Sequence, residues 1–111
     1  GAALALFRAV GSRLGEANVY AGLSRLLIDE DLQESRRMLD SALAIRQEIN
    51  DVYGEGANLG NYGIALLQRG RQEEALTYLQ RARELFASRN LDAQAQQMDA
   101  LIAQAQRAGS D

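Results

Sequence analysis

Residues 50–82 read NDVYGEGANLGNYGIALLQRGRQEEALTYLQRA and indicate most about how the chain folds. Large apolar residues recur among them at helical spacing, at Leu59, Tyr62, Leu66 and Leu67. Four glycines also lie among them, at positions 54, 56, 60 and 63. Each glycine costs about 1 kcal/mol relative to alanine in a helix interior, so we expect close approach of neighbouring helices to offset that cost. The alternative is a flexible loop over residues 54–63, but the helical spacing of the apolar residues continues straight through them.

Helix formers fill the rest of the chain as well. Its 111 residues include no proline, and Ala, Leu, Gln, Glu and Arg dominate. Turn and capping residues concentrate at Gly11-Ser12, Asp29-Glu30-Asp31, Asn50-Asp51, Gly70 and Asn90-Leu91-Asp92. These breaks predict an all-α chain of about six antiparallel helices, over residues 2–10, 13–28, 32–49, 52–69, 72–88 and 92–107.

The sequence repeats itself at a distance of forty residues. Residues 17–50 placed on residues 57–90 give eight identities, most of them at small or apolar positions. The pairs are Ala17 and Ala57, Asn18 and Asn58, Leu26 and Leu66, Leu27 and Leu67, Glu34 and Glu74, Leu39 and Leu79, Ala42 and Ala82, and Asn50 and Asn90. We interpret the repeat as a packing unit of two helices. A weaker similarity between residues 3–6 and 42–45 suggests that the first helix is the second half of an earlier repeat.

The second repeat resembles the tetratricopeptide (TPR) signature of small and large residues. Leu59, Tyr62, Gly63 and Leu66 are followed by Ala75, Leu79 and Ala82 at the spacing of that signature. Residues 50–90 resemble the forty-residue variety of the repeat found in kinesin light chains, Leu-Gly-Asn-type polarity adaptors and many bacterial regulators. In the first repeat Leu23 stands where the small residue belongs, unless the register shifts by one residue to Gly22.

The resemblance implies a tetratricopeptide-like solenoid, a right-handed α-α superhelix, in a single domain over residues 1–111. Residues 1–11 would be the second helix of a truncated repeat, and residues 12–50 and 51–90 would be two repeats. Residues 91–108 are rich in glutamine and resemble a terminal capping helix.

The two helices of the second repeat differ in charge. Glu55 is the single charged residue between Val52 and Gln68, whereas residues 71–89 contain seven charged residues. In tetratricopeptide arrays the first helix of each repeat lines a concave groove, so the resemblance implies a groove with little charge. The groove would present Tyr20, Ser24, Leu27, Asn61, Ile64 and Gln68, with Asn58 near its edge.

Asn61 matches the asparagine that hydrogen-bonds the ligand backbone in peptide-binding members of the family. An amide both donates and accepts, so it suits an extended peptide of any sequence. The alternative is that Asn61 bonds to a neighbouring helix or faces water. The chain has no lysine, and no arginine falls on the matching inner positions, so a clamp for a terminal carboxylate is not expected. We predict a protein–protein interaction scaffold that binds a protein or peptide segment through leucine-type anchors.

The composition argues against several other classes of function. No histidine, cysteine or lysine occurs, so the commonest general bases and covalent nucleophiles are missing. We predict no catalytic residue, metal or cofactor, and we interpret Asp29-Glu30-Asp31 as a turn and a helix cap because it lacks the spaced ligands of a calcium loop. The net charge of -3 and the absence of a basic stripe argue against nucleic acid. No long apolar run suggests a membrane span, and a cytoplasmic location is the expectation.

The first predicted helix carries an apolar face without a partner helix in the sequence. We expect that face either to pack against a missing part of a longer array, the chain then being a fragment, or to pair with a second copy in a homodimer. The residues predicted for self-association are Leu4, Phe7 and Val10.

Overall fold

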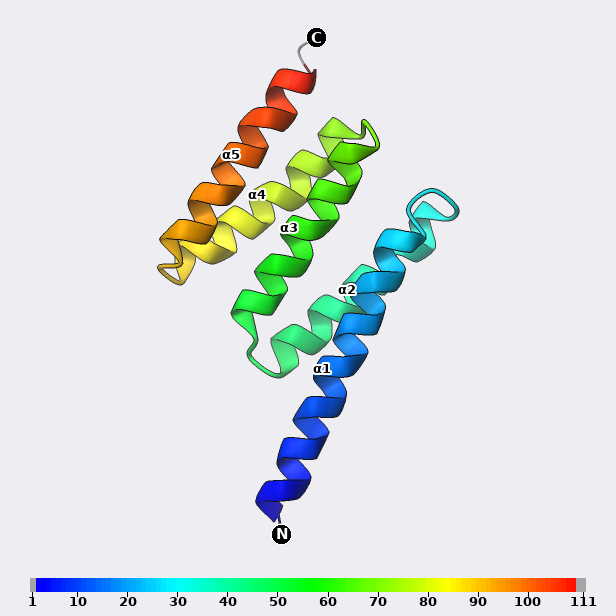
Figure 1. Ribbon diagram of the computed structural model, residues 1–111, viewed down its shortest axis with the longest axis vertical. Coiled ribbons are helices and arrows are strands. Elements are labelled where there is room, and N and C mark those ends of the chain that lie inside the picture. Colours follow the sequence, from blue (N-terminus) through cyan, green and yellow to red (C-terminus); the bar gives the residue numbers. More distant parts are fainter. Residues whose placement is uncertain (1, 110–111) are drawn as a thin grey trace. The chain divides into compact units, whose positions relative to one another are not determined.

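The computed structural model describes the backbone of residues 2–109 and the side chains of residues 11–109, and this part of the chain consists of α-helices and turns (Figure 1). The helices are α1 (Ala2–Leu26), α2 (Leu32–Glu48), α3 (Val52–Gln68), α4 (Gln72–Ser88) and α5 (Asp92–Gly109). The chain divides into two compact units, one that contains α1 and α2 and one that contains α3, α4 and α5. The all-α class is confirmed, but the described residues form five helices rather than six.

The predicted break at Gly11-Ser12 is wrong, because α1 is one helix of 25 residues. One glycine in a helix interior costs only about 1 kcal/mol, and helix formers on both sides continue the hydrogen bonding. Residues 2–11 are therefore the beginning of the first helix of a pair, and not the second helix of an earlier repeat. Since α2 has 17 residues, α1 is about 12 Å longer. The other helix ends lie within two residues of their predicted positions.

Helices α2, α3 and α4 all end in the same way, at intervals of twenty residues. Asn50, Gly70 and Asn90 follow them with φ angles of 59°, 74° and 61°, in the left-handed region that favours glycine and asparagine. In each case the next residue donates its N–H to the carbonyl five residues back. The three bonds are Asp51 to Arg46 (2.8 Å), Arg71 to Leu66 (3.0 Å) and Leu91 to Phe86 (2.9 Å). This arrangement is the Schellman motif, which satisfies carbonyls that the helix end would leave unbonded.

The turn between α1 and α2 is closed differently. Asp31 donates its N–H to the carbonyl of Leu27, four residues back, at 2.8 Å. The carboxylate of Asp31 then accepts a hydrogen bond from the N–H of Glu34 at 3.1 Å and so caps α2. The prediction of a turn and a cap at residues 29–31 is confirmed. The hydrogen bond that closes this turn spans one residue fewer than the bond after α3, and α1 is displaced by one residue relative to the repeat.

The forty-residue register therefore holds for α2 and α4 but not for α1 and α3. Leu39 and Leu79 are both buried, whereas Leu26 is 74% exposed and its match Leu66 is fully buried. The residue that takes the place of Gly63 is Ser24, 39 residues earlier, which is 1% exposed. The alternative of a shift to Gly22 is wrong, since a Cβ at that position would meet nothing within 4 Å.

Contacts to the second helix of each pair support this equivalence. The carbonyl of Ser24 accepts a hydrogen bond from the hydroxyl of Ser35. Forty residues after Ser35 is Ala75, whose carbonyl lies 3.3 Å from the position that a Cβ at Gly63 would occupy. Ser24 and Gly63 therefore face the same position on the neighbouring helix.

Three of the four glycines of α3, at positions 56, 60 and 63, lie where it meets its neighbours. A Cβ at Gly56 would come within 2.4 Å of the Phe86 ring, and one at Gly63 within 2.8 Å of Cγ of Leu79. These distances are too short for a real Cβ, so α3 approaches α4 more closely than alanine would allow. The expected close approach at these glycines is confirmed, and the flexible loop over residues 54–63 is excluded because these residues lie within α3.

Arg46 occupies in the first unit the place that Phe86 has in the second. It is 7% exposed, and its guanidinium donates to a carboxylate oxygen of Asp51 at 2.8 Å and to Oδ1 of Asn18 at 2.7 Å. Because a buried charge is costly unless it is paired, these bonds offset part of the cost of burying arginine at this position.

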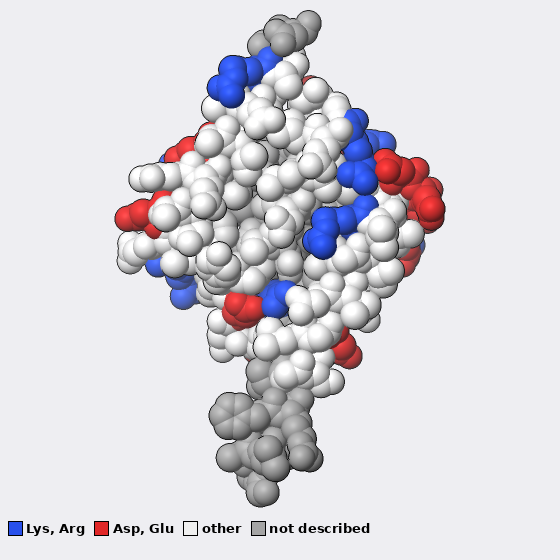
Figure 2. Space-filling view, in the orientation of Figure 1, with Lys and Arg blue, Asp and Glu red and all other residues white. Residues whose placement is uncertain are grey.

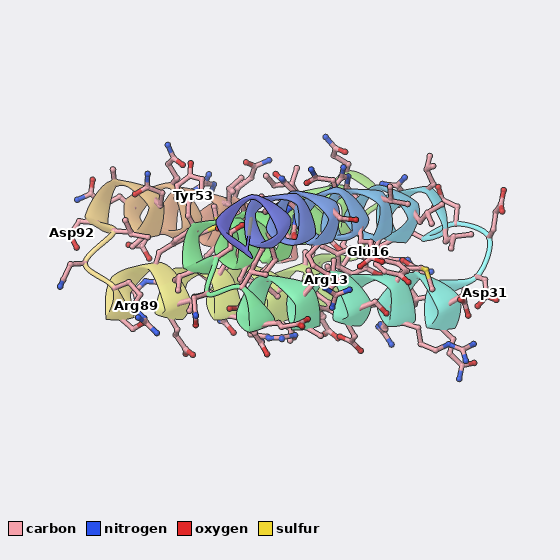
Figure 3. All side chains as sticks on the ribbon, turned by 90° about the horizontal axis from the view of Figure 1, so that it is seen from below. Arg13, Glu16, Asp31, Tyr53, Arg89 and Asp92 are labelled. Carbon is pink, nitrogen blue, oxygen red and sulfur yellow. The ribbon has the colours of Figure 1, made fainter. Side chains whose placement is uncertain are left out.

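Other charges lie on outer surfaces of the helices. In Figure 2 the surface over the middle of α3 and α5 carries no charged side chain. In the first unit Arg13 of α1 forms ion pairs with Glu16, three residues later on the same helix (Figure 3), and with Glu48 of α2. The hydrogen bond to Glu48 raises the pKa of the Arg13 guanidinium above its ordinary value.

Candidate binding groove between α3 and α5

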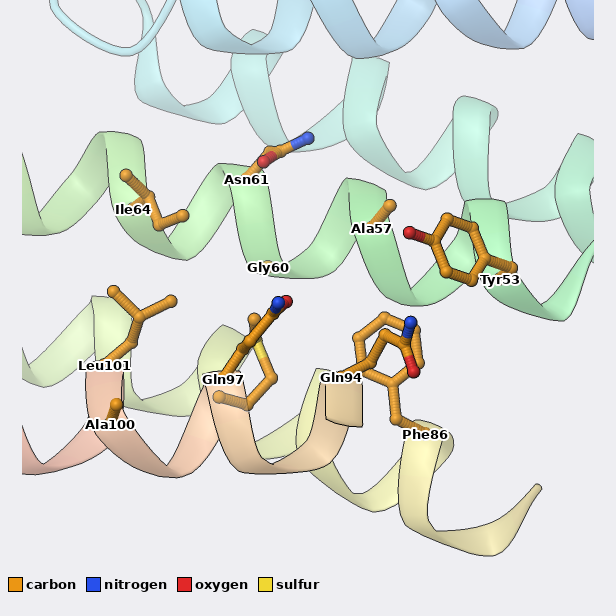
Figure 4. Close-up of a pocket in the computed structure, with 11 residues that line it drawn as sticks. Tyr53, Ala57, Gly60, Asn61, Ile64, Phe86, Gln94, Gln97, Ala100 and Leu101 are labelled. Carbon is orange, nitrogen blue, oxygen red and sulfur yellow. The ribbon is translucent and has the colours of Figure 1, made fainter. Parts of the chain in front are cut away.

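A groove of about 560 Å³ runs between α3 and α5 in the second unit (Figure 4). Its lining comes from three helices and consists entirely of uncharged residues. Helix α3 contributes Tyr53, Ala57, Gly60, Asn61 and Ile64, helix α4 contributes Phe86, and helix α5 contributes Gln94, Gln97, Met98, Ala100 and Leu101.

Helical periodicity brings these side chains to one face of each helix. Positions 53, 57, 60, 61 and 64 of α3 lie on one face of that helix, because each is three or four residues from another member of the set. Positions 94, 97, 98 and 101 of α5 follow the same pattern. Gly60 allows the two helices to approach, because a Cβ there would lie 3.1 Å from Sδ of Met98. The flexible thioether of Met98 fills the space that remains.

The buried members of the lining form the floor of the groove, and the exposed ones form its walls. Gly60, Phe86 and Met98 are buried. Ile64 of α3 and Leu101 of α5 are half-buried on opposite walls. The site therefore offers an apolar floor between two helical walls.

Amide and aromatic side chains complete the walls. Asn61 and Gln97 are exposed and Gln94 is half-buried. Tyr53 is 56% exposed, and its ring lies 6.0 Å from the ring of Phe86 at one end of the groove. A hydrophobic floor with a few polar groups above it is the usual composition of a binding site.

Two of the residues predicted for the groove are brought together in it, namely Asn61 and Ile64. Gln68 lies on the same face of α3, one turn beyond Ile64; it is exposed and does not line the groove. Asn58 is 8% exposed, so it does not form an open edge of the groove.

The three residues predicted from the first repeat lie elsewhere. Ser24 is buried and its hydroxyl donates to the carbonyl of Ala21 at 2.6 Å, which corrects its assignment to a ligand-binding surface. Tyr20 and Leu27 are half-buried and, with the displacement of α1, correspond to buried residues of α3 rather than to its groove face. The positions of α1 that correspond to Asn61 and Ile64 are occupied by Gly22 and Arg25.

Several groove residues were missed by sequence reasoning. Tyr53 and Ala57 lie one and two turns before Asn61, so extending that stripe along α3 would have found them. The α5 residues were missed because the glutamines of this helix were interpreted as the polar surface of a cap. The apolar residues Met98 and Leu101, three apart and interleaved with Gln94 and Gln97, were the available signal.

The side chains of Leu4, Phe7 and Val10, predicted for self-association, lie outside the described residues. The described part of α1 does expose apolar side chains. Val19 is 61% exposed, Leu23 38% and Leu26 74%, and the three follow one stripe of the helix.

The part of the chain that the structure describes contains no group of three acidic side chains placed to hold a metal ion. None of its helices combines the length and apolar character needed to cross a membrane.

Helices α2, α3 and α4 have equal lengths and end in the same motif at twenty-residue intervals. Glycines lie at the helix contacts, and a neutral groove lies beside them. These features define a helical-repeat protein. The family model described as tetratricopeptide repeat matches residues 26–88, and the chain belongs to the tetratricopeptide repeat family. The matched residues include α2, α3 and α4, whereas α5 lies beyond them. The sequence matched none of the curated proteins and none of the solved structures with which it was compared. Tetratricopeptide repeats generally mediate protein–protein interactions.

Proposed function

We propose that the chain is a protein–protein interaction scaffold, and that the groove between α3 and α5 holds a segment of another protein. The observation that supports this most is the composition of the groove, in which a buried apolar floor lies below exposed amides. Covering such a floor contributes roughly 25 cal/mol for each Å² of apolar surface removed from water. The amides would fix the orientation of the bound segment.

Substitutions on the two sides of the second unit test this proposal. Partner proteins would be identified by affinity capture and mass spectrometry, and the binding of each purified partner would be measured by calorimetry. Ile64→Arg places a charge in the groove and is expected to weaken binding at least tenfold, while Asn61→Ala is expected to weaken it less. Arg81→Ala is the matched control, because Arg81 lies over the Tyr78 ring of α4, outside the groove. Equal losses for Ile64→Arg and Arg81→Ala would overturn the assignment.

A second candidate function is self-association of the chain as a homodimer through α1. It is supported by the exposed apolar stripe of Val19, Leu23 and Leu26. Identical patches can pair across a two-fold axis, and exposed apolar stripes of this kind mark interaction surfaces. Light scattering should then report a dimer, which Leu26→Asp or Phe7→Asp converts to a monomer while the exposed control Gln47→Asp does not. A monomeric parent chain removes this candidate.

A further inference from the structure

The exposed face of α1 carries glycines as well as large apolar side chains. Val19 is 61% exposed and Leu26 is 74% exposed. A Cβ at Gly15 or Gly22 would meet no described atom within 4 Å, so the backbone is open to a neighbour at both positions. The four residues follow one another at intervals of four, three and four residues, which is the spacing of the positions that face a partner in a pair of helices.

The corresponding face of α3 is shielded from water. With the displacement of α1 by one residue, Val19 and Leu26 correspond to Asn58 and Ala65, which are 8% and 6% exposed. The stripe on α1 is therefore an apolar surface at positions that the other first helix keeps buried. Exposed apolar surface of this kind marks an interaction site.

The order of residues in the stripe is complementary to itself. When two copies of α1 lie antiparallel, with a two-fold axis passing between residues 20 and 21, residues whose numbers add up to 41 lie at the same level. Val19 of one copy then lies opposite Gly22 of the other, and Gly15 lies opposite Leu26. Each large side chain meets the open backbone of a glycine, so the two helices can pack at one distance along the whole stripe.

A parallel pair of the same helices would not fit in this way. It would set Val19 against Val19 and Gly22 against Gly22, which forces the large residues apart and leaves gaps between the glycines. It would also bring Glu16 level with Glu16 and Arg25 level with Arg25. The antiparallel pair instead brings Glu16 level with Arg25 of the other copy, and complementary charges favour one orientation over another.

We infer that the chain forms a homodimer in which two copies of α1 pack antiparallel, with Gly15 and Gly22 of each copy receiving Leu26 and Val19 of the other. This inference rests on the second candidate function, self-association through α1, and specifies the direction and the register of the pairing. A contact along one helix is smaller than the roughly 1,200–2,000 Å² of a stable interface, so the dimer should dissociate on dilution.

The first experiment measures the mass of the whole chain by analytical ultracentrifugation between about 10 μM and about 1 mM, which spans weak to moderate affinities. The expected result is a monomer that converts to a dimer as the concentration rises. A chain that stays monomeric over this range overturns the inference together with self-association, and leaves the stripe to a segment of another protein.

An exchange of side-chain sizes tests the register. Gly22→Val sets a valine against Val19 of the other copy and should weaken the dimer at least tenfold. Adding Val19→Ala to the same chain sets a small residue against the new valine again, and should restore the affinity to within about threefold of the parent. Gln33→Val is the matched control, since Gln33 is an exposed residue of α2. Circular dichroism of each variant confirms that the helices are retained.

Disulfide formation between single-cysteine variants tests the direction, because the parent chain has no cysteine. Gly15→Cys and Leu26→Cys would be mixed and oxidised, and the products weighed by mass spectrometry. Positions 15 and 26 are about 16 Å apart along a helix, whereas a disulfide requires Cα atoms within about 7 Å. The antiparallel pair should therefore give mainly the mixed disulfide, in which two cysteines replace one glycine and one leucine with little change in volume. A parallel pair would give mainly disulfides within each variant.

The outcomes separate the inference from the candidate function on which it rests. A dimer that survives Leu26→Asp overturns self-association through α1. If Leu26→Asp abolishes the dimer but Gly22→Val leaves its affinity unchanged, or disulfides within each variant predominate, the α1 interface stands and the antiparallel pairing is overturned.

Discussion

The pair α1–α2 and the pair α3–α4 have second helices in the same register but first helices that differ by one residue. The turn after α3 closes with a bond from Arg71 to the carbonyl five residues back, whereas the turn after α1 closes with a bond from Asp31 to the carbonyl four residues back. A difference of one residue in a turn thus changes which residues of the preceding helix face its partner. Identity at a distance of forty residues is therefore a poor guide to the faces of α1.

The same comparison explains two unlike residues at corresponding positions. Where α3 has Gly63 against Leu79, α1 has Ser24, whose hydroxyl and carbonyl are both hydrogen-bonded. Where α4 buries Phe86, α2 buries Arg46 with two polar partners. The second unit is thus held by tight apolar contacts at these points, and the first by hydrogen bonds.

Replacement of the buried residues Phe86 and Arg46 should give the largest difference in the free energy of unfolding. Phe86→Ala should lower the free energy of unfolding by about 3–5 kcal/mol, because it leaves a cavity beside Gly56. Replacing both members of the ion pair, Arg46→Met with Asp51→Asn, should change it by less than about 1 kcal/mol, since exchanging a whole buried ion pair for uncharged side chains is often neutral, whereas Arg46→Met alone leaves Asp51 without that partner. Urea unfolding followed by circular dichroism measures all three variants. A loss for the double variant as large as that for Phe86→Ala would contradict the distinction between the two positions.

An exchange at the helix contact should have a smaller effect. Gly63→Ser should cost about 1–3 kcal/mol of unfolding free energy, because the new side chain overpacks against Leu79. Ser24→Gly should cost about 1 kcal/mol, through lower helix propensity and a lost hydrogen bond. The same urea titration applies. If Gly63→Ser were neutral or stabilising, the close approach of α3 and α4 would not require glycine.

The smallest expected effect concerns the turns. Gly70→Ala should cost about 1 kcal/mol, since an alanine is strained at a φ of 74°. Glu30→Ala is the matched change in the turn after α1, where no left-handed residue is needed, and it should alter the thermal midpoint very little. Equal shifts of the two midpoints in a calorimetric scan would contradict the distinction between the turns.

Most of the fold follows from local signals in the sequence. Asn50, Gly70 and Asn90 mark helix ends because few residues tolerate a left-handed backbone, so these boundaries were predictable. The continuity of α1 across Gly11 was not, because a single glycine is a weak breaker whose effect depends on the helix around it.

The lining of the candidate groove was predictable in part, for a related reason. Asn61 and Ile64 were found because the charge pattern and the family resemblance both point to the inner face of α3. Ser24 was misplaced because the geometry of the turn at Asp31 depends on backbone hydrogen bonds that composition does not specify. Whether Gln97 lines the groove depends on which side of α5 meets α3. The glutamine-rich sequence of α5 has few apolar residues that would indicate that side.

The proposed binding of protein segments in the groove of the second unit is tested most directly with a partner protein identified by affinity capture. Its affinity would be measured for the parent chain, for Ile64→Arg, and for Arg25→Ala, the change at the corresponding position of α1. Ile64→Arg should weaken binding at least tenfold, and Arg25→Ala should change it by less than about twofold. Unchanged affinity for Ile64→Arg, or a larger loss for Arg25→Ala, would contradict the proposal.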